Sequence, residues 1–175
     1  MPVNKNTFFK YEAPFGPLAI VTGPAGLSYL GFGVMPEATF IYKQSYPIRT
    51  QMPNNYIKEI IKQLDEYFAG SRQHFNLTLA YHGTPFQQAV WKALQEIPYG
   101  STCSYSDIAR RIGKAAACRA VGQAIHRNPI ALIIPCHRVI AKNGQLVGFS
   151  GGLRIKQWLL DFEKQTVIRQ TAAGR

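Results

Sequence analysis

The sequence predicts an α+β protein, in which a small N-terminal α/β module with a β-meander precedes a mainly helical C-terminal domain with a helix-turn-helix. Two observations support this fold class. Short strand-like runs separated by glycine and proline turns occupy the first 33 residues, and apolar residues recur at helical spacing after residue 83. With 175 residues, of which 46% are hydrophobic, the chain can bury such a core without cross-links.

The N-terminal module begins with three strand-like runs whose intervening glycines and prolines predict tight antiparallel connections. Residues 36–53 have no clear periodicity, and we expect a loop or irregular segment there. Asn54 or Asn55 then caps an expected helix that keeps its apolar residues on one face and ends before Gly70. The three strand-like runs are residues 7–13, 18–22 and 27–32.

The C-terminal domain is expected to begin with a helix, because Thr84 can cap it and Pro85 suits its first position. Pro98 follows the last apolar residue of this helical run and marks its end. The predicted boundaries are an N-terminal α/β module at residues 1–82, a mainly helical C-terminal domain at residues 83–164, and a flexible tail at residues 165–175.

Two short helices follow, and their spacing is typical of a helix-turn-helix. Ser104 or Ser106 can cap the first helix, Gly113 ends it, and the second is expected at residues 116–126. Small residues on the second helix allow close approach to DNA, although they equally allow close packing in a helical core. The final helix is expected from Leu153 to Glu163. Its apolar face would contain Ile155, Trp158, Leu159 and Phe162.

The net charge of +11 favours a polyanionic partner, either a nucleic acid or an anionic membrane surface. The alternative is that the positive charge serves only solubility. No apolar run is long enough to cross a bilayer, and the first residues lack the apolar core of a signal peptide. We therefore expect a cytoplasmic protein. Its three cysteines form no C-x-x-C pair, which argues against a disulfide framework or a zinc site, so we expect no metal and no cofactor.

The segment Ile133 to Ile140 places Cys136, His137 and Arg138 in what otherwise reads as a core strand. A cysteine attacks as a thiolate, and a neighbouring base or cation promotes that form. Adjacent residues of a strand point to opposite faces, however, so His137 would reach the thiol only through a water or a backbone bend. Glu163 is one of few carboxylates that can orient the imidazole. The alternative is that Cys136 is a small buried apolar residue.

These residues resemble the O6-alkylguanine-DNA alkyltransferases, or methylated-DNA–protein-cysteine methyltransferases, densely over residues 84–163 and in pattern only before them. The resemblance implies that Cys136 accepts an alkyl group irreversibly from O6 of guanine or O4 of thymine in duplex DNA. The matching residues are Pro135 to Ile140, Gly148 to Gly152, Lys156, Trp158 to Leu160, Glu163, Arg119 to Gly122, and Asn128-Pro129.

The resemblance also implies roles for other residues. His137 acts as a base through water, Glu163 orients it, and Asn128 holds the turn between the second helix and the cysteine segment. Arg119 replaces the extruded nucleotide in the duplex, and Tyr105 contacts the phosphate and the flipped base. The remaining DNA-binding candidates are Ala120, Gly122 and Arg127, and the base pocket is expected to contain Val139, Phe149, Ser150 and Gly151.

The implied partner is double-stranded DNA that contains O6-alkylguanine or O4-alkylthymine, bound by a monomer with no membrane contact. The implied setting is a bacterial-type cytosol with activity at the nucleoid. The competing interpretations are a non-catalytic damage-recognising or regulatory helix-turn-helix protein, and a cysteine hydrolase. Cys136 argues against the non-catalytic protein. The basic second helix of the helix-turn-helix argues against the hydrolase. The role of Arg138, structural or phosphate-facing, stays open.

Overall fold

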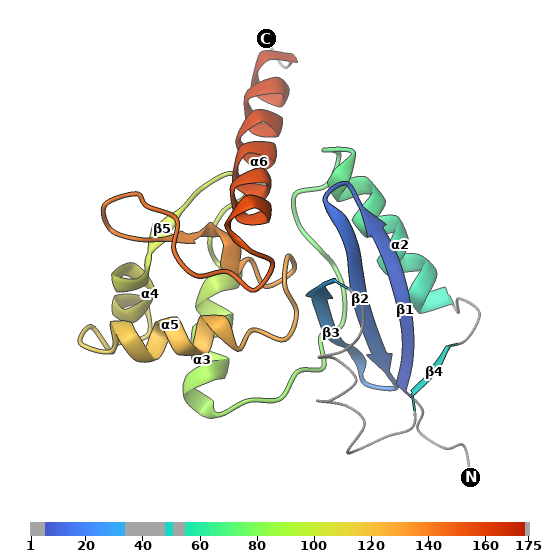
Figure 1. Ribbon diagram of the computed structural model, residues 1–175, viewed down its shortest axis with the longest axis horizontal. Helices are drawn as coiled ribbons and strands as arrows, with labels where there is room; N and C mark the ends of the chain where they lie inside the picture. The colour runs from blue at the N-terminus through green and yellow to red at the C-terminus, as the bar shows by residue number, and fades with distance from the viewer. Residues whose placement is uncertain (1–5, 34–47, 51–54, 174–175) are drawn as a thin grey trace. The chain divides into compact units, whose positions relative to one another are not determined.

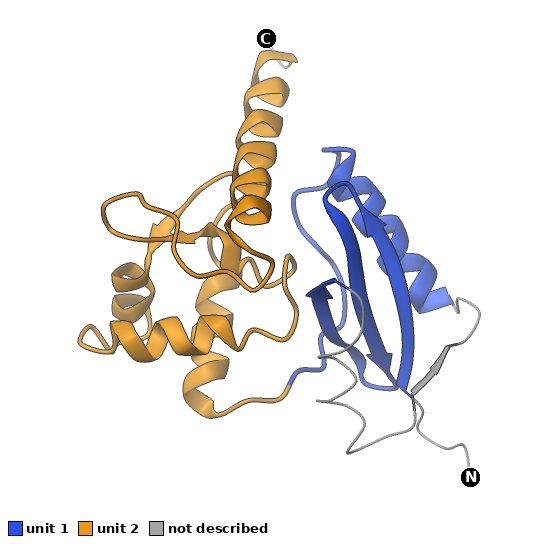
Figure 2. Cartoon of the chain, viewed as in Figure 1, with its two compact units in different colours: residues 1–81 blue, residues 82–175 orange. Residues whose placement is uncertain are grey.

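The structure is a computed structural model that describes residues 6–33, 48–50 and 55–173 (Figure 1). The chain divides into two compact units, residues 1–81 and residues 82–175 (Figure 2). In the described residues, the first contains a sheet and helix α2, and the second is mainly helical, which confirms the predicted α+β class. Within the described part of the chain, no helix combines the length and the apolar character needed to cross a membrane.

The first unit contains a four-stranded sheet in the order β3-β2-β1-β4. Its first three strands pair antiparallel as the predicted meander, and β4 pairs parallel with β1. The strand β4 corrects the expectation of an irregular segment at residues 36–53; a three-residue strand is too short to show a periodicity, and the rest of that segment lies outside the described residues. The strands are β1 (Asn6–Ala13), β2 (Gly16–Gly23), β3 (Gly26–Phe32) and β4 (Ile48–Thr50).

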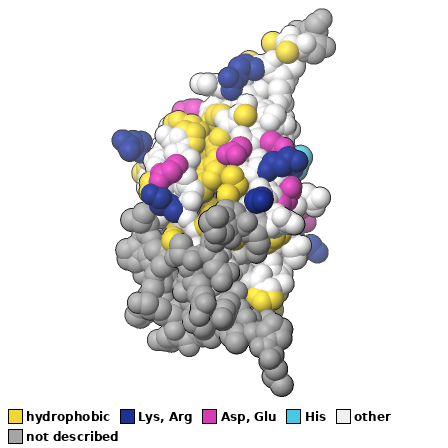
Figure 3. All heavy atoms as spheres, turned by 90° about the vertical axis from the view of Figure 1, so that its right-hand side faces the viewer, with side chains coloured by type: hydrophobic (Ala, Val, Ile, Leu, Met, Phe, Trp, Pro, Cys, Tyr) yellow, Lys and Arg dark blue, Asp and Glu magenta, His cyan; other side chains and the backbone are white. Residues whose placement is uncertain are grey.

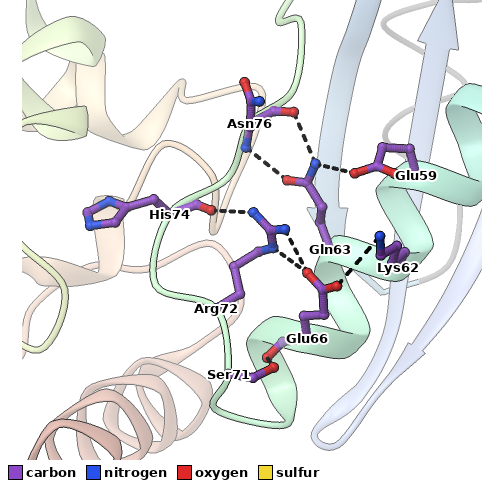
Figure 4. Close-up of polar contacts among 8 residues, drawn as sticks. All are labelled: Glu59, Lys62, Gln63, Glu66, Ser71, Arg72, His74 and Asn76. Carbon is purple, nitrogen blue, oxygen red and sulfur yellow. Dashed lines mark hydrogen bonds and ion pairs between the residues drawn. The ribbon is translucent and has the colours of Figure 1, made fainter.

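Helix α2 (Asn55–Phe68) supplies the apolar face that the periodicity predicted, with Ile57, Ile60 and Leu64 fully buried. Polar side chains then attach the chain after α2 back onto this helix (Figure 4). The guanidinium of Arg72 bonds to Glu66 through Nε at 2.7 Å and to a backbone carbonyl through NH1 at 2.8 Å. This network fixes the segment that leads out of the first unit.

The second unit holds the predicted helices together with two very short strands that pair parallel to one another. Capping boxes start two helices: Thr84 with Gln87, and Ser104 with Asp107, so Ser104 rather than Ser106 is the cap. The elements are α3 (Pro85–Gln95), β5 (Cys103–Ser104), α4 (Tyr105–Arg111), α5 (Cys118–His126), the 3-10 helix η1 (Cys136–Arg138), β6 (Val139–Ile140) and α6 (Leu153–Ala173).

Helices α4 and α5 pack against each other as the expected helix-turn-helix. Gly113 lies in the turn with φ +68°, a conformation that glycine adopts without strain. Helix α5 begins at Cys118 and not at Ala116, because residues 115 and 116 form a turn. Its N-cap residue, Ala117, makes no side-chain capping bond.

Helix α6 differs from the prediction in length and in the face that it buries. It continues to Ala173, where a flexible tail was expected from residue 165, because Thr166 is buried and anchors the additional turns. The buried residues of α6 are Lys156, Leu159, Glu163 and Thr166, whereas Ile155, Trp158 and Phe162 are only partly buried. The apolar pattern therefore indicated a face rotated away from the one that the fold buries.

Candidate active site

The cysteine segment is a tight turn, which corrects the expectation of a core strand. Cys136, His137 and Arg138 form one turn of 3-10 helix, closed by a 3.1 Å hydrogen bond from Arg138 N to Pro135 O. In a strand these three side chains would alternate between faces, whereas here all three are buried, with exposed fractions of 5%, 0% and 6%. The turn brings the thiol, the imidazole and the guanidinium into the same interior.

The carboxylate of Glu163, in α6, contacts both His137 and Arg138. Its Oε1 lies 2.9 Å from His137 Nε2 and 2.8 Å from Arg138 NH2. Its Oε2 accepts bonds from Arg138 Nε at 2.9 Å and from the backbone N–H of Gly100 at 3.0 Å. Both carboxylate oxygens therefore receive two contacts each, which compensates the carboxylate for the loss of water.

The structure answers the open question about Arg138. Its guanidinium is buried, binds Glu163 through two nitrogens, and donates a third bond to the carbonyl of Ile97 at 2.7 Å. It also lies over the ring of Tyr99, with 5.5 Å between Cζ and the ring centroid. Arg138 thus belongs to the interior of the second unit and does not face a phosphate.

Asn128 connects the end of α5 to the cysteine turn. Its Nδ2 donates to the carbonyl of Ile134 at 2.7 Å, and its Oδ1 accepts from the backbone N–H of Ile130 at 3.0 Å. These two bonds fix the chain on the N-terminal side of Cys136, and the Asn128 side chain also stabilises the Cys136 thiolate. Asn128 therefore bonds to the chain that leads into the cysteine turn, and it lowers the pKa of Cys136.

Burial controls the protonation of the thiol and the imidazole. It raises the pKa of Cys136, against the opposing effects of Asn128, the charge of Lys156 and nearby backbone N–H groups. Burial lowers the pKa of His137, so the imidazole is neutral at pH 7 even though Glu163 opposes this shift. Burial alone would raise the pKa of Glu163, but hydrogen bonds from His137 and Arg138 and the positive charge of Arg138 outweigh it and lower that pKa.

The Nδ1 atom of His137 is buried and has no hydrogen-bond partner among the described residues. The other ring nitrogen, Nε2, is committed to Glu163. A neutral imidazole that donates through Nε2 presents a lone pair at Nδ1.

The loop before α6 carries three of the four expected base-pocket residues. Phe149 and Gly151 are partly buried and Ser150 is exposed, while Val139 is fully buried in β6. Lys156 Nζ donates to the carbonyl of Val147 at 2.9 Å, and the Tyr105 hydroxyl donates to the same oxygen at 3.4 Å. This loop is therefore tied both to α6 and to the first helix of the helix-turn-helix.

The expected DNA-binding residues lie on and around α5. Arg119, Ala120 and Arg127 are exposed, which leaves them accessible to a ligand. Gly122 is the exception: it is partly buried, and a Cβ there would lie 3.8 Å from the ring of Tyr105. That distance is an ordinary van der Waals contact, so α5 faces Tyr105 at this position without requiring glycine.

The positive charge of the chain is concentrated in the second unit. Residues 82–175 contain 13 Lys and Arg against 4 Asp and Glu, whereas residues 1–81 contain 7 against 5. The face drawn in Figure 3 carries acidic side chains beside basic ones. A polyanion would therefore be attracted to the unit that holds the helix-turn-helix and Cys136.

Metal-ligating side chains do not cluster in the part of the chain that the structure describes: it contains no group of three or more His, Cys, Asp or Glu that could hold an ion. His74, His82 and His126 are exposed at separate points of the chain. Cys103 and Cys118 are partly buried free thiols.

Comparison with known proteins matches both units to one family. Residues 8–81 match the 6-O-methylguanine DNA methyltransferase ribonuclease-like domain, and residues 85–165 match the DNA-binding domain of the same proteins. The chain belongs to the 6-O-methylguanine DNA methyltransferase family. Family membership agrees with the resemblance drawn from the Cys136 motif.

Curated relatives match over nearly their whole length. The methylated-DNA–protein-cysteine methyltransferase of Methanosarcina acetivorans is 44% identical over 87% of this chain and 95% of its own. That of Mycobacterium leprae is 45% identical over 90% of this chain and 92% of its own. The family architecture therefore extends through both units of the chain.

Solved structures of relatives have the same fold as this chain. The O6-methylguanine methyltransferase of Mycobacterium tuberculosis has a TM-score of 0.79 at 39% identity, and covers 92% of this chain and 94% of its own. The OGT of the same organism in complex with DNA has a TM-score of 0.80 at 39% identity, and covers 91% of this chain and 94% of its own. The fold of this family member is thus shared with a protein solved on DNA.

Two contributors to the site of this methyltransferase-family chain were not assigned a role from the sequence. Lys156 is fully buried although it is charged, and the backbone N–H of Gly100 supplies one of the four contacts to Glu163. Lys156, Leu159, Glu163 and Thr166 are spaced three, four and three residues apart, so a helical face containing both charges was detectable. Gly100 offered no such signal, because a backbone donor depends on the chain path alone.

Proposed function

We propose that this chain repairs alkylated DNA by transferring an alkyl group from O6 of guanine, or from O4 of thymine, to Sγ of Cys136. The observation that carries the proposal is the buried Cys136 beside the neutral His137, whose imidazole is bonded to Glu163. Relatives named methylated-DNA–protein-cysteine methyltransferases, at 44–45% identity over most of the chain, support the same chemistry.

The reaction is a nucleophilic displacement at the alkyl carbon. A water between Cys136 and His137 takes the thiol proton and passes a proton to Nδ1, and the thiolate then attacks the alkyl carbon. The new S–C bond forms as the C–O6 bond breaks, and the bond electrons leave with the base oxygen. The released nucleobase finally takes up one proton, which balances the proton that the thiol lost. The products are a thioether on Cys136 and an unmodified nucleobase.

Access to the base requires that it leave the duplex, because a stacked base cannot reach a buried thiol. Unstacking costs a few kcal/mol, and least for a poorly paired, damaged base. Exposed Arg119 on α5 would fill the gap and offset part of this cost. Tyr105, at the start of α4 and in contact with the pocket loop, would guide the flipped nucleotide toward Cys136.

The pocket that receives the base would be formed by Val139, Phe149, Ser150 and Gly151, with Ser150 and backbone groups reading the guanine edge. Ala120, Gly122 and Arg127 would support the contact of α5 with the duplex. The partner is double-stranded DNA that contains the lesion, bound by a monomer in the cytoplasm. Each protein molecule can accept one alkyl group on Cys136, because the thioether that forms has no bond that water readily breaks.

Stoichiometry tests this function. A duplex with one O6-methylguanine is supplied in tenfold excess over the protein, and repaired DNA is counted over time. We expect a plateau at one repaired duplex per protein molecule. Continued repair beyond that plateau would indicate a turning-over enzyme, and binding without repair would indicate a damage-recognising protein that does not act on the lesion.

A further inference from the structure

We propose that Arg138 is a positioning residue for alkyl transfer: by occupying both oxygens of Glu163, it fixes the proton of His137 on Nε2 and leaves Nδ1 as the base. This inference rests on the proposed role of Cys136 as the alkyl acceptor. It assigns a function to a residue that touches neither the thiol proton nor the DNA.

Arg138 is held more rigidly than a salt bridge alone requires. Its Nε and NH2 contact the two oxygens of Glu163 at 2.9 and 2.8 Å, and its NH1 donates to the carbonyl of Ile97 at 2.7 Å. The ring of Tyr99 lies against the guanidinium. Because each nitrogen of the fork has its own partner, the guanidinium cannot rotate without breaking several contacts, and Glu163 is held in one orientation.

A count of donors then determines the tautomer of His137. Arginine nitrogens and a backbone N–H can only donate, so three of the four contacts to Glu163 require it to accept. A carboxylate in this setting is ionised and has no proton to offer the imidazole. The fourth contact, from His137 Nε2 at 2.9 Å, must therefore also be donated to Glu163. The neutral imidazole carries its proton on Nε2, and Nδ1 is the acceptor.

Arg138 also limits how strongly Glu163 attracts a second proton to the imidazole. The charged groups that face His137 are Glu163 and Lys156 on α6 and Arg138 within its own turn. Glu163 favours the imidazolium, whereas burial and the two cations oppose it. With Arg138 present, the carboxylate shares its charge between two partners, and His137 stays neutral and able to act as a base.

Replacement of Arg138 by methionine removes the cation and leaves the volume largely filled. Glu163 would then attract the imidazole alone, so the pKa of His137 rises, and the imidazolium has no lone pair at Nδ1. We expect the lower inflection of the pH–rate profile of methyl transfer to move up by about one unit. Below the inflection, the rate falls about tenfold while the affinity for the same DNA stays unchanged.

The first unit provides a matched control. Arg72 contacts Oε2 of Glu66 through Nε and NH2, both at 2.7 Å, and donates from NH1 to the carbonyl of His74 at 2.8 Å (Figure 4). Like Arg138, it uses all three nitrogens, but it binds only one oxygen of its glutamate. Arg72→Met therefore breaks an arginine–glutamate pair that lies outside the site and is partly exposed. We expect it to lower the free energy of unfolding without moving the pH–rate inflection.

The experiment has two independent readouts. The first is ¹⁵N NMR of labelled wild-type protein and the Arg138→Met, Arg138→Lys and Arg72→Met variants, titrated from pH 5 to 8, which reports the tautomer and the pKa of His137. The second is the single-turnover rate of methyl transfer from a duplex containing O6-methylguanine over the same pH range. Arg138→Lys keeps the charge, so we expect it to restore most of the wild-type inflection.

The proposal is supported if the wild-type protein carries its His137 proton on Nε2 and Arg138→Met raises both the pKa and the inflection. It is overturned if the wild-type proton is on Nδ1, a result that needs no variant to fold. It is equally overturned if Arg138→Met lowers stability but leaves the inflection where Arg72→Met leaves it. Failure of wild-type protein to transfer methyl at any pH would instead refute the proposed function, while the NMR readout would still test the tautomer.

Discussion

The side-chain nitrogen of Lys156 donates a 2.9 Å hydrogen bond to the carbonyl of Val147, which joins α6 to the loop that carries the proposed base pocket. The lysine is fully buried, and its Nζ lies 5.9 Å from the ring centroid of Phe149. Burial lowers its pKa, while the neighbouring Cys136 thiolate favours its charged form. Lys156 is thus placed to hold the loop and to stabilise the thiolate.

Lys156→Met should separate reactivity from stability. The variant loses the bond to Val147 and the positive charge near Cys136, so we expect methyl transfer to slow about tenfold, as for a one-unit rise in the thiol pKa. A buried charge replaced by an apolar side chain of similar length costs little stability or increases it. Stopped-flow repair rates and urea unfolding test both. Lys164→Met, an exposed change on the same helix, is the control, and an equal loss of rate in both variants would contradict this role.

Arg119→Ala should impair repair of duplex DNA far more than reaction with free O6-benzylguanine. Only the duplex leaves a gap to be filled, and unstacking costs a few kcal/mol. We expect a loss of about tenfold or more on the duplex and little change with the free base. Repair rates on the two substrates test this, with Lys92→Ala as a control for loss of one exposed cation. Equal losses on both substrates would refute the gap-filling role.

Stability should fall in mildly acidic solution because of His137. Burial lowers the pKa of this group in the folded protein, so the unfolded chain binds a proton that the folded chain does not. Its stabilising contribution is complete above the ordinary histidine pKa of about 6.5 and is lost as pH falls below it. Between pH 7.5 and 5.5, we expect the free energy of unfolding to drop by about 1 kcal/mol more in the wild-type protein than in His137→Gln.

Urea unfolding at the two pH values measures this difference. His82→Gln removes an exposed histidine and should behave as the wild-type protein does. If His137→Gln loses as much stability on acidification as the wild-type protein, the acid sensitivity does not come from the buried imidazole.

Local signals were sufficient to predict most elements of the fold. Turn residues between the first strands, the Thr84 cap and the glycine between α4 and α5 act within a few residues, so the sequence reveals them. The three-residue β4 could not be found this way, because its pairing with β1 is set by tertiary contact. The cysteine turn was read as a strand because branched residues flank it, a preference that the fold overrides.

The reactive residues of the site could be predicted from the sequence, but their hydrogen-bond partners could not. Cys136, His137 and Glu163 could be named from residue type and resemblance. The place of Arg138 could not, because a buried cation is costly unless paired, and its partner lies 25 residues later in the chain. The apolar pattern also pointed to a rotated face of α6, because it counts only apolar residues. The fold instead buries the charged Lys156 and Glu163 and leaves Trp158 partly exposed.

The site of alkylation tests the central claim most directly. Wild-type protein, Cys136→Ala and Cys118→Ala are each incubated with a duplex containing O6-methylguanine, and the intact mass and a peptide map are recorded. We predict one added methyl group, located on Cys136, in the wild-type protein and in Cys118→Ala, and none in Cys136→Ala. Methylation of Cys136→Ala, or a methyl group on Cys103 or Cys118 of the wild-type protein, would contradict the assignment of Cys136 as the acceptor.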